Sequence, residues 1–184
     1  MVAPLSTPDL SPSIASRASR IALVVADVDG VLTDGGVYYG AEGEVMKRFN
    51  IRDGMGVERL RAAGVPTAII TGEASPSVDR RAAKLSIDIL YLSCKDKAAA
   101  LREIIEKQGV SANQVAYIGD DVNDLEAMKL AGLAACPADA VREVREIAHY
   151  ICAAPGGHGA FRELAEQIIE AKNADEGERT VGFG

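Results

Sequence analysis

The sequence has no tryptophan, few aromatic residues of any kind and no excess of basic residues. Aromatic side chains make up only 4% of its 184 residues, too few for the stacking surfaces that bind single-stranded nucleic acids. The 20 basic residues are outnumbered by 27 acidic ones, whereas nucleic acids and anionic membranes bind basic faces. No apolar run reaches the roughly 18 residues that cross a bilayer. We therefore expect neither nucleic acid nor a membrane as a partner, but a small anionic ligand in a locally positive site is compatible with this composition.

Cysteine and histidine are also scarce. The three cysteines, Cys94, Cys136 and Cys152, are widely spaced, and their odd number argues against a disulfide framework. They are typical of free thiols in the reducing cytoplasm, which is the compartment we expect. The only histidines are His149 and His158, too few to suggest a zinc site.

The composition indicates one globular domain. Hydrophobic residues form 48% of the chain, enough for a substantial core, and the length fits a single domain. Residues 1–20 are rich in serine and proline, and we expect them to be a disordered leader. Residues 21–171 are expected to form the folded domain, and the polar residues 172–184 a flexible tail.

Short apolar runs alternate with amphipathic segments along the domain. The runs predict strands buried on both faces, as in a parallel sheet, at Ile21–Ala26, Ala68–Ile70, Ile87–Leu92, Val115–Ile118, Leu133–Cys136 and Tyr150–Ile151. The amphipathic segments predict helices at Met55–Ala63, Ser77–Leu85, Asp96–Lys107, Val122–Leu130, Ala140–Ile147 and Gly159–Ala171. The alternation predicts an α/β fold with a doubly wound, mostly parallel sheet. One segment departs from it: Gly36–Tyr39 and Glu44–Phe49 predict a β-hairpin directly after the first strand.

Acidic residues follow two of the predicted strands. Asp27 and Asp29 come at the end of the first, and Asp120, Asp121 and Asp124 come after the fourth. Either group alone could be a turn or a helix cap. Carboxyl ends of parallel strands meet at one edge of a sheet, however, and carboxylates crowded there need a counter-charge. Carboxylate oxygens are the ligands that Mg²⁺ prefers, so we expect a magnesium site.

Two further segments suit a phosphate group. Thr71 and Gly72 end the second predicted strand and offer a hydroxyl and a backbone N–H, although the pair could be an ordinary turn. Lys97 lies near a helix start, where a cation is disfavoured unless an anion is close; the alternative is a solvated surface lysine.

Together these residues specify a phosphoryl transfer. Asp27 is the candidate nucleophile, and Asp29 is the candidate acid that protonates the leaving oxygen and later activates water. Thr71 and Lys97 would hold the phosphate oxygens as their charge changes.

Four short motifs occur in order along the chain: Asp27-x-Asp29-Gly-x-x-Thr-Asp, Thr71-Gly72, Lys97 and Gly119-Asp120-Asp121-x-x-Asp124. The set resembles the motifs of the haloacid dehalogenase superfamily of phosphohydrolases, over residues 21–171. The resemblance implies Mg²⁺ held by Asp27, Asp120 and the backbone carbonyl of Asp29. It also implies that Asp124, and less clearly Asp121, support the site as ligands or from behind the ligands.

Only the hairpin separates the first two motifs, so no large cap domain is expected. The segments 29–35, 49–54 and 156–163 resemble the capless branch of 3-deoxy-D-manno-octulosonate 8-phosphate phosphatases. That resemblance implies a phosphorylated sugar acid as substrate. It also implies a homotetramer in which the hairpins and glycine-rich tails close neighbouring sites.

The sequence departs from that branch at two positions. Glu73 and His158 stand where those enzymes usually carry arginine. Glu73 followed by Lys84 resembles instead the enzymes acting on 2-keto-3-deoxynononate or N-acylneuraminate 9-phosphates, although the pair could be a surface ion pair. Both the nine-carbon and the eight-carbon acids therefore stay as candidate substrates.

The candidate substrate-binding residues are Thr33, Arg52, Gly72, Glu73, Lys84 and His158. Arg52 could bind the substrate carboxylate or be solvated, and His158 could reach substrate across an interface or fill its loop. Other functions considered are a broad-specificity or phosphomutase-like enzyme, a catalytically silent scaffold, and a receiver domain. The intact set of Asp27, Asp29, Lys97 and Asp120 argues against a silent scaffold.

Overall fold

A six-stranded parallel sheet lies at the centre of the computed structural model, which describes residues 13–181. The strand order is β5-β4-β1-β6-β7-β8, and every neighbouring pair is parallel. The strands are β1 (Leu23–Ala26), β4 (Thr67–Ile70), β5 (Ile89–Tyr91), β6 (Val115–Ile118), β7 (Leu133–Cys136) and β8 (Tyr150–Ile151). The predicted α/β fold is confirmed.

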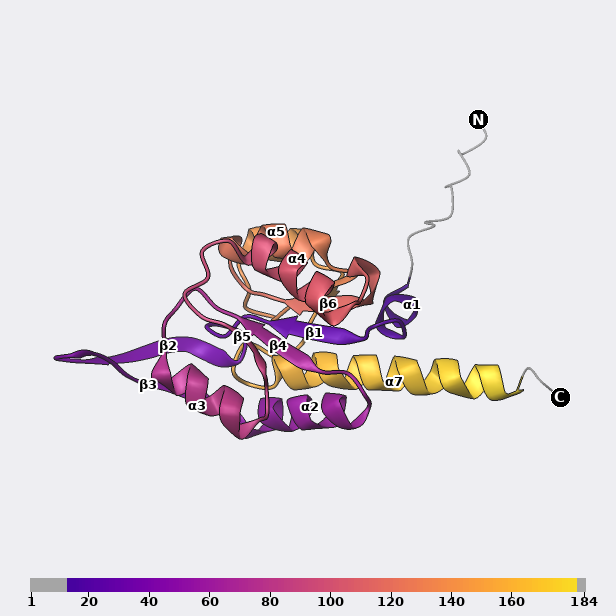
Figure 1. Cartoon of the computed structure of the whole chain (residues 1–184), viewed down its shortest axis with the longest axis horizontal. Coiled ribbons are helices and arrows are strands. Elements are labelled where there is room, and N and C mark those ends of the chain that lie inside the picture. The colour runs from indigo at the N-terminus through magenta and orange to yellow at the C-terminus, as the bar shows by residue number, and fades with distance from the viewer. Residues whose placement is uncertain (1–12, 182–184) are drawn as a thin grey trace, which may run out of the picture.

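Helices cover both faces of the sheet (Figure 1). One layer contains α2 (Ile51–Ala62), α3 (Pro76–Lys84) and α7 (Ala160–Val181). The other contains α4 (Lys97–Gln108), α5 (Leu125–Leu130) and α6 (Arg142–Ile147). Two short 3-10 helices, η1 (Ala112–Gln114) and η2 (Val122–Asp124), precede β6 and α5. Among residues 13–181, no helix is both long and apolar enough to cross a membrane.

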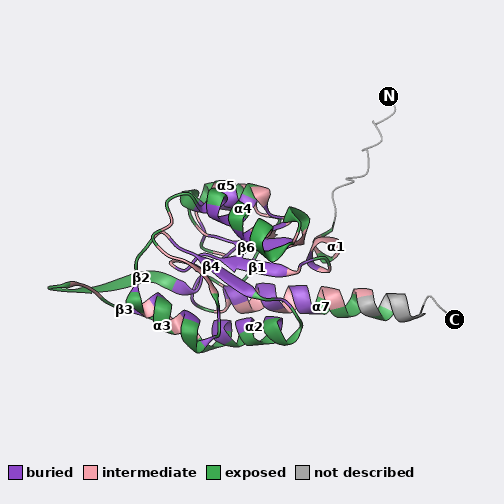
Figure 2. Cartoon of the chain, in the orientation of Figure 1, coloured by how far each residue is buried: buried purple, intermediate pink, exposed green. Residues whose placement is uncertain are grey.

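Successive side chains of β1 enter two different cores. Val24 and Ala26 pack on the layer that contains α2 and α7, and Leu23 and Val25 pack on the layer that contains α4 and α5. All residues of β1 are buried, as Figure 2 shows for the strands in the middle of the molecule. Burial on both faces explains why these strands read as unbroken apolar runs.

The hairpin consists of β2 (Thr33–Gly40) and β3 (Gly43–Phe49), paired antiparallel. It extends away from the body of the molecule, on the side where β1 ends (Figure 1). It is longer than the predicted Gly36–Tyr39 and Glu44–Phe49, because β2 starts directly after the loop that follows β1. No large cap domain is present among the described residues, as expected.

Both ends of the described chain contain more structure than expected. Helix α1 (Ile14–Ala18) lies within the predicted leader; the Ser13 side chain accepts a hydrogen bond from the Ser16 amide, and Ala18 is buried. Helix α7 continues to Val181, through most of the predicted tail, where the sequence has helix-forming residues and no proline. The remaining parts of those predictions, residues 1–12 and 182–184, lie outside the described residues.

Candidate active site

Three strand ends with polar residues meet at one edge of the sheet. Strand β1 lies between β4 and β6, so Asp27, Thr71 and Asp120 come together although they are far apart in sequence. A pocket of about 160 Å³ opens at this edge. Its lining residues are Asp27, Asp29, Thr71, Gly72, Glu73, Asp120, Asp121 and Asn123.

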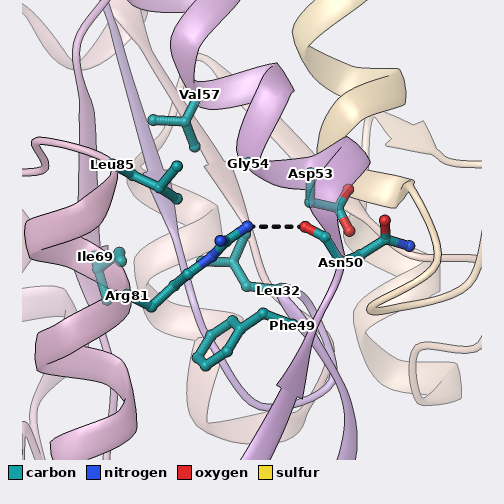
Figure 3. Close-up of a pocket in the computed structure, with 9 residues that line it drawn as sticks. All are labelled: Leu32, Phe49, Asn50, Asp53, Gly54, Val57, Ile69, Arg81 and Leu85. Carbon is teal, nitrogen blue, oxygen red and sulfur yellow. Dashed lines mark hydrogen bonds between the residues drawn. The ribbon is translucent and has the colours of Figure 1, made fainter.

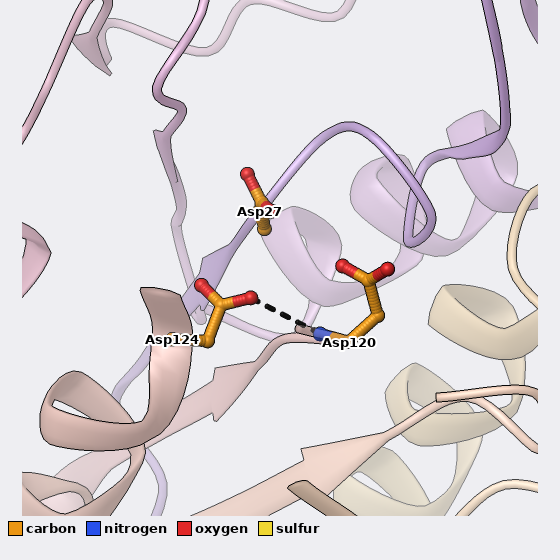
Figure 4. Close-up of side chains that lie close together, drawn as sticks. All are labelled: Asp27, Asp120 and Asp124. Atoms are coloured by element: carbon orange, nitrogen blue, oxygen red, sulfur yellow. Dashed lines mark hydrogen bonds between the residues drawn. The ribbon is translucent and has the colours of Figure 1, made fainter. Parts of the chain in front are cut away.

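Three carboxylates cluster at this pocket: Asp27 and Asp120 line it, and Asp124 is fully buried beside them. One oxygen each of Asp27, Asp120 and Asp124 lies within 4.8 Å of the others, and Figure 4 shows the side chains converging from two strand ends. Burial and the charge of Asp124 raise the pKa of Asp27 to about 7. Burial and the charge of Asp27 raise the pKa of Asp120 to about 8. The cluster therefore holds more negative charge than the surrounding protein neutralises.

The hydrogen bonds divide the three carboxylates into two kinds. Asp124 Oδ1 accepts from Lys97 Nζ and from the Tyr117 hydroxyl, each at 2.8 Å. Asp124 Oδ2 accepts from the amides of Asp120 at 3.1 Å, drawn in Figure 4, and Asp121 at 3.4 Å. Asp120 Oδ1 is buried and has no hydrogen-bond partner among the described residues. Asp124 thus orients the residues that donate hydrogen bonds to it. Asp120 and Asp27 have oxygens suited to a divalent cation, so the site fits Mg²⁺.

Lys97 is the cation closest to the cluster. It is the first residue of α4, and its buried Nζ lies 2.8 Å from Asp27 Oδ2 and 2.8 Å from Asp124 Oδ1. Burial opposes its charge, but Asp27 and Asp124 outweigh this effect and raise the pKa of Lys97. A lysine at a helix start is accounted for here by two neighbouring carboxyl groups.

Asp29 faces the hairpin. Lys47 Nζ in β3 donates to both of its carboxylate oxygens at 2.6 Å. Lys47 was not among the predicted site residues, and neither was Tyr117. The sequence offered one signal for Lys47, a lysine in the middle of a strand that returns toward the first motif. Nothing in the sequence marked the Tyr117 hydroxyl, which lies in an ordinary apolar run.

Thr71 and Thr33 occupy different positions. Thr71 is buried in the pocket wall next to Gly72, and its amide donates to the Tyr91 carbonyl at 2.9 Å. Thr33 is buried behind the loop and does not line the pocket. Its hydroxyl donates to the Val28 carbonyl at 3.3 Å and accepts from the Gly35 amide at 3.2 Å. Thr33 therefore shapes the loop that carries Asp29.

Several predicted substrate-binding residues are outside the pocket of this chain. Arg52 is exposed at the start of α2, and Lys84 ends α3, about 12 Å along that helix from its pocket-side end. His158 belongs to the loop before α7 and contacts the hairpin, where its Nε2 lies 2.8 Å from an Arg48 nitrogen. Glu73 lines the pocket and is exposed. Lys84 does not line this pocket, so the structure does not bring Glu73 and Lys84 together within one chain.

Asp121 also differs from its neighbours in the acidic motif. It is exposed at the pocket rim, and its side chain accepts from the Val122 amide at 2.6 Å. Asp121 thus caps η2, the alternative that its position in the sequence had left open.

Glycines allow the loop before α7 (residues 152–159, here called the tail loop) to pack closely against the loop after β1. A Cβ on Gly156 would lie 1.9 Å from the Gly30 carbonyl oxygen. Gly30 has φ +85°, and a Cβ there would lie 2.0 Å from Asp120 Oδ2. The close stacking of Gly156, Gly30 and Asp120 therefore requires glycine at both positions.

A second cavity lies between α2, α3 and the base of the hairpin (Figure 3). Its free volume is about 10 Å³, the size of a single water. The Arg81 side chain reaches into it, donates to the Asn50 carbonyl at 2.9 Å and lies 5.7 Å from the centre of the Phe49 ring. Arg81 thus fastens α3 to the base of the hairpin, and this cavity is structural.

Comparison with known proteins gives a consistent result. The family model of haloacid dehalogenase-like hydrolases matches residues 44–132. The 3-deoxy-D-manno-octulosonate 8-phosphate phosphatase KdsC of Haemophilus influenzae is 40% identical over 156 residues, covering 85% of this chain and 87% of the relative. KdsC of Yersinia pestis is 39% identical over 168 residues, covering 91% and 90%.

Solved structures of such enzymes share the fold. The phosphatase of Moraxella catarrhalis, solved in complex with a magnesium ion, a phosphate ion and a KDO molecule, has a TM-score of 0.85 and 38% identity. The match covers 91% of this chain and 97% of that one. A cobalt-bound form of the H. influenzae phosphatase has a TM-score of 0.84 and 39% identity, covering 85% and 92%.

Proposed function

Since the chain belongs to the haloacid dehalogenase-like hydrolases, we propose that it is a magnesium-dependent phosphatase of a 2-keto-3-deoxy sugar acid. It is a phosphoric monoester hydrolase, as its relatives are. The observation that carries the proposal is the pocket in which the buried, unpartnered Asp120 Oδ1 lies close to Asp27 and Lys97. We also propose the cytoplasm as its compartment, on the ground of its three free cysteines.

Asp27 and Asp120 would hold the Mg²⁺ ion, together with the main-chain carbonyl of Asp29 that the family resemblance implies. When bound, the ion supplies positive charge that offsets the repulsion between the Asp27 carboxylate and a dianionic phosphate. Asp124 holds Lys97 and the Asp120 loop in place through its four hydrogen bonds.

Asp27 is the proposed nucleophile. Its carboxylate oxygen bonds to phosphorus as the bond from phosphorus to the sugar oxygen breaks, and Asp29 gives that oxygen a proton. Water then attacks the aspartyl phosphate, passing its proton to Asp29, and inorganic phosphate leaves. Lys97 and Thr71 hold the remaining phosphate oxygens in both steps. Lys97 is well placed for this, since its Nζ is 2.8 Å from Asp27 Oδ2.

The first candidate substrate is 3-deoxy-D-manno-octulosonate 8-phosphate, the substrate in the names of the curated relatives. A specific observation favours a second candidate, a nonulosonate 9-phosphate. Glu73 lines the pocket, at the position where the octulosonate enzymes usually carry arginine. A broad-specificity phosphatase is the remaining alternative.

We further propose a homotetramer in which the hairpin and the glycine-rich loop of one subunit close the pocket of a neighbour. The hairpin exposes five large apolar side chains, more than an isolated hairpin in water accounts for: Val37, Tyr38, Tyr39, Val45 and Met46. The pocket also lacks a lining cation within one chain, among the described residues, that could meet a sugar-acid carboxylate.

Side-by-side kinetics on the 8-phosphate and 9-phosphate, with Mg²⁺ present, test the proposal. A strong preference for one ester supports a dedicated sugar-acid phosphatase and identifies its substrate. Uniformly weak rates across a panel of phosphate esters would favour the broad-specificity alternative. Absence of hydrolysis with every ester would overturn the proposal.

A further inference from the structure

Lys47 is a buried cation in a strand that is otherwise largely exposed. The strand β3 returns from the tip of the hairpin to the body of the protein, and the Lys47 side chain is fully buried near the end of this strand. Burying a charge is costly unless partners compensate it closely. The lysine therefore needs a structural or functional reason to be there.

Its main partner is Asp29. Lys47 Nζ is 2.6 Å from both Asp29 oxygens, so it contacts the whole carboxylate rather than one end of it. The other polar group near this side chain, the Thr33 hydroxyl, is 3.5 Å from Oδ1. Lys47 is thus the principal restraint on the direction in which Asp29 points.

Lys47 is itself held from behind. Glu44 Oε2 is 3.5 Å from Lys47 Nζ, and Glu44 Oε1 accepts a short hydrogen bond from the buried Ser75 hydroxyl. Ser75 is the residue immediately before α3. A continuous set of polar contacts therefore runs from α3 through the hairpin to Asp29.

We propose that Lys47 is the positioning residue that holds Asp29 where it exchanges a proton with the leaving oxygen. This inference rests on the proposed function, because it assigns Asp29 the acid role. The inference predicts that loss of Lys47 lowers catalytic efficiency most for esters whose leaving oxygen needs a proton. An alkoxide of a sugar leaves poorly without one, whereas 4-nitrophenolate leaves readily as an anion.

The test compares the Lys47→Met variant with wild type on two esters, the preferred sugar-acid phosphate and 4-nitrophenyl phosphate. The measured quantity is kcat/KM, which reports the steps through release of the alcohol. Loss of a residue that orients a catalytic group costs about 10- to 100-fold. We expect a loss of that size on the sugar ester and a loss below about 3-fold on the nitrophenyl ester. Lys129→Met, at an exposed lysine of α5, is the matched control and should match wild type on both.

Further variants keep the inference falsifiable if Lys47→Met does not fold. Lys47→Arg keeps a cation at this position. It should therefore lose kcat/KM mainly on the sugar ester, as Lys47→Met does, but by a smaller factor. Where Lys47→Met folds, combining it with Asp29→Asn should cost little more than Asp29→Asn alone, because both changes remove the same function.

Equal losses on the two esters, or no loss on the sugar ester, would overturn the inference alone, as would full additivity in the double variant. Wild-type protein that hydrolyses neither ester would overturn the proposed function and this inference with it.

Discussion

Asp27 and Asp120 place two carboxylates close together where water has little access. Their pKa values, raised to about 7 and about 8, express the cost of ionising both in the absence of a counter-ion. Asp124, in contrast, accepts four hydrogen bonds, from Lys97 Nζ, the Tyr117 hydroxyl and two backbone amides. The residues predicted to carry chemistry are thus also those that strain the metal-free protein.

Replacing one of these carboxyl groups with an amide, which cannot ionise, should stabilise the metal-free protein. We expect Asp120→Asn to raise its melting temperature by about 2–4 °C, the shift that 1 kcal/mol gives in a domain of this size. The same variant should lose the rise in melting temperature that Mg²⁺ causes in wild type. Thermal unfolding with EDTA and with Mg²⁺ measures both effects. A lower melting temperature in EDTA would show that Asp120 is not under electrostatic strain.

The pH dependence of stability follows from the same two groups. In the unfolded chain both carboxyls ionise near the ordinary pKa of 3.8, whereas in the folded protein they keep their protons until about pH 7 to 8. Between about pH 4 and pH 8 the folded state therefore binds more protons, and stability falls as pH rises. Melting temperatures in EDTA should decrease across this window, and Mg²⁺ should flatten the decrease. A flat profile in EDTA would contradict these pKa shifts.

The residue types of the site could be predicted from the sequence, because carboxylates at adjacent strand ends have few structural uses. For Lys47 the sequence offered only its place in the returning strand, and its contact with Asp29 depends on how the hairpin folds back. The division of roles between Asp120 and Asp124 could not be predicted, because it depends on where the Lys97 and Tyr117 donors reach.

At the scale of elements, the strands in the middle of the sheet were predicted to the residue at Val115–Ile118 and Leu133–Cys136. Burial on both faces makes them purely apolar, so their ends are sharp in sequence. Helix α2 begins at Ile51 instead of the predicted Met55, because the Asn50 side chain accepts from the Arg52 amide at 2.8 Å. Such a cap depends on side-chain geometry and not on hydrophobic periodicity.

The tail loop and the loop after β1 pack so closely that one added methyl group should displace them. Gly156→Ala places a Cβ against the Gly30 carbonyl, in the loop that follows Asp29. We expect turnover to fall at least about 10-fold, since small displacements of catalytic groups are costly. Gly177→Ala is the control, because no atom of the described residues outside its own helix lies within 4 Å of the added Cβ. Steady-state kinetics of both variants decide the point, and unchanged turnover in Gly156→Ala would show that the loops do not depend on each other.

At the scale of the whole molecule, one chain provides a catalytic floor but an open pocket. The hairpin extends into solvent with Tyr39 73% exposed, and Arg52, Lys84 and His158 lie outside the pocket. Their distances from the pocket could not be predicted from the sequence, because those distances depend on how α2, α3 and the loop before α7 pack around the sheet.

The proposed tetramer gives a direct prediction. Replacing Tyr38 and Tyr39 with serine removes apolar surface from the hairpin without touching Asp27 or Lys97. Light scattering after gel filtration should show a tetramer for wild type and smaller species for the variant. The variant should also lose kcat/KM on the sugar ester, since its pockets are no longer closed. A wild-type monomer with full activity would refute the assembly.

The most direct test of the proposed function measures phosphate release by EDTA-treated protein before and after Mg²⁺ is added. The substrates are 3-deoxy-D-manno-octulosonate 8-phosphate and a nonulosonate 9-phosphate, and the Asp27→Asn variant is measured in parallel. We expect no turnover without the ion, restored turnover of one of these esters with it, and no turnover by a folded Asp27→Asn variant under either condition. Hydrolysis by the metal-free protein, or near-normal hydrolysis by Asp27→Asn, would contradict the proposed function.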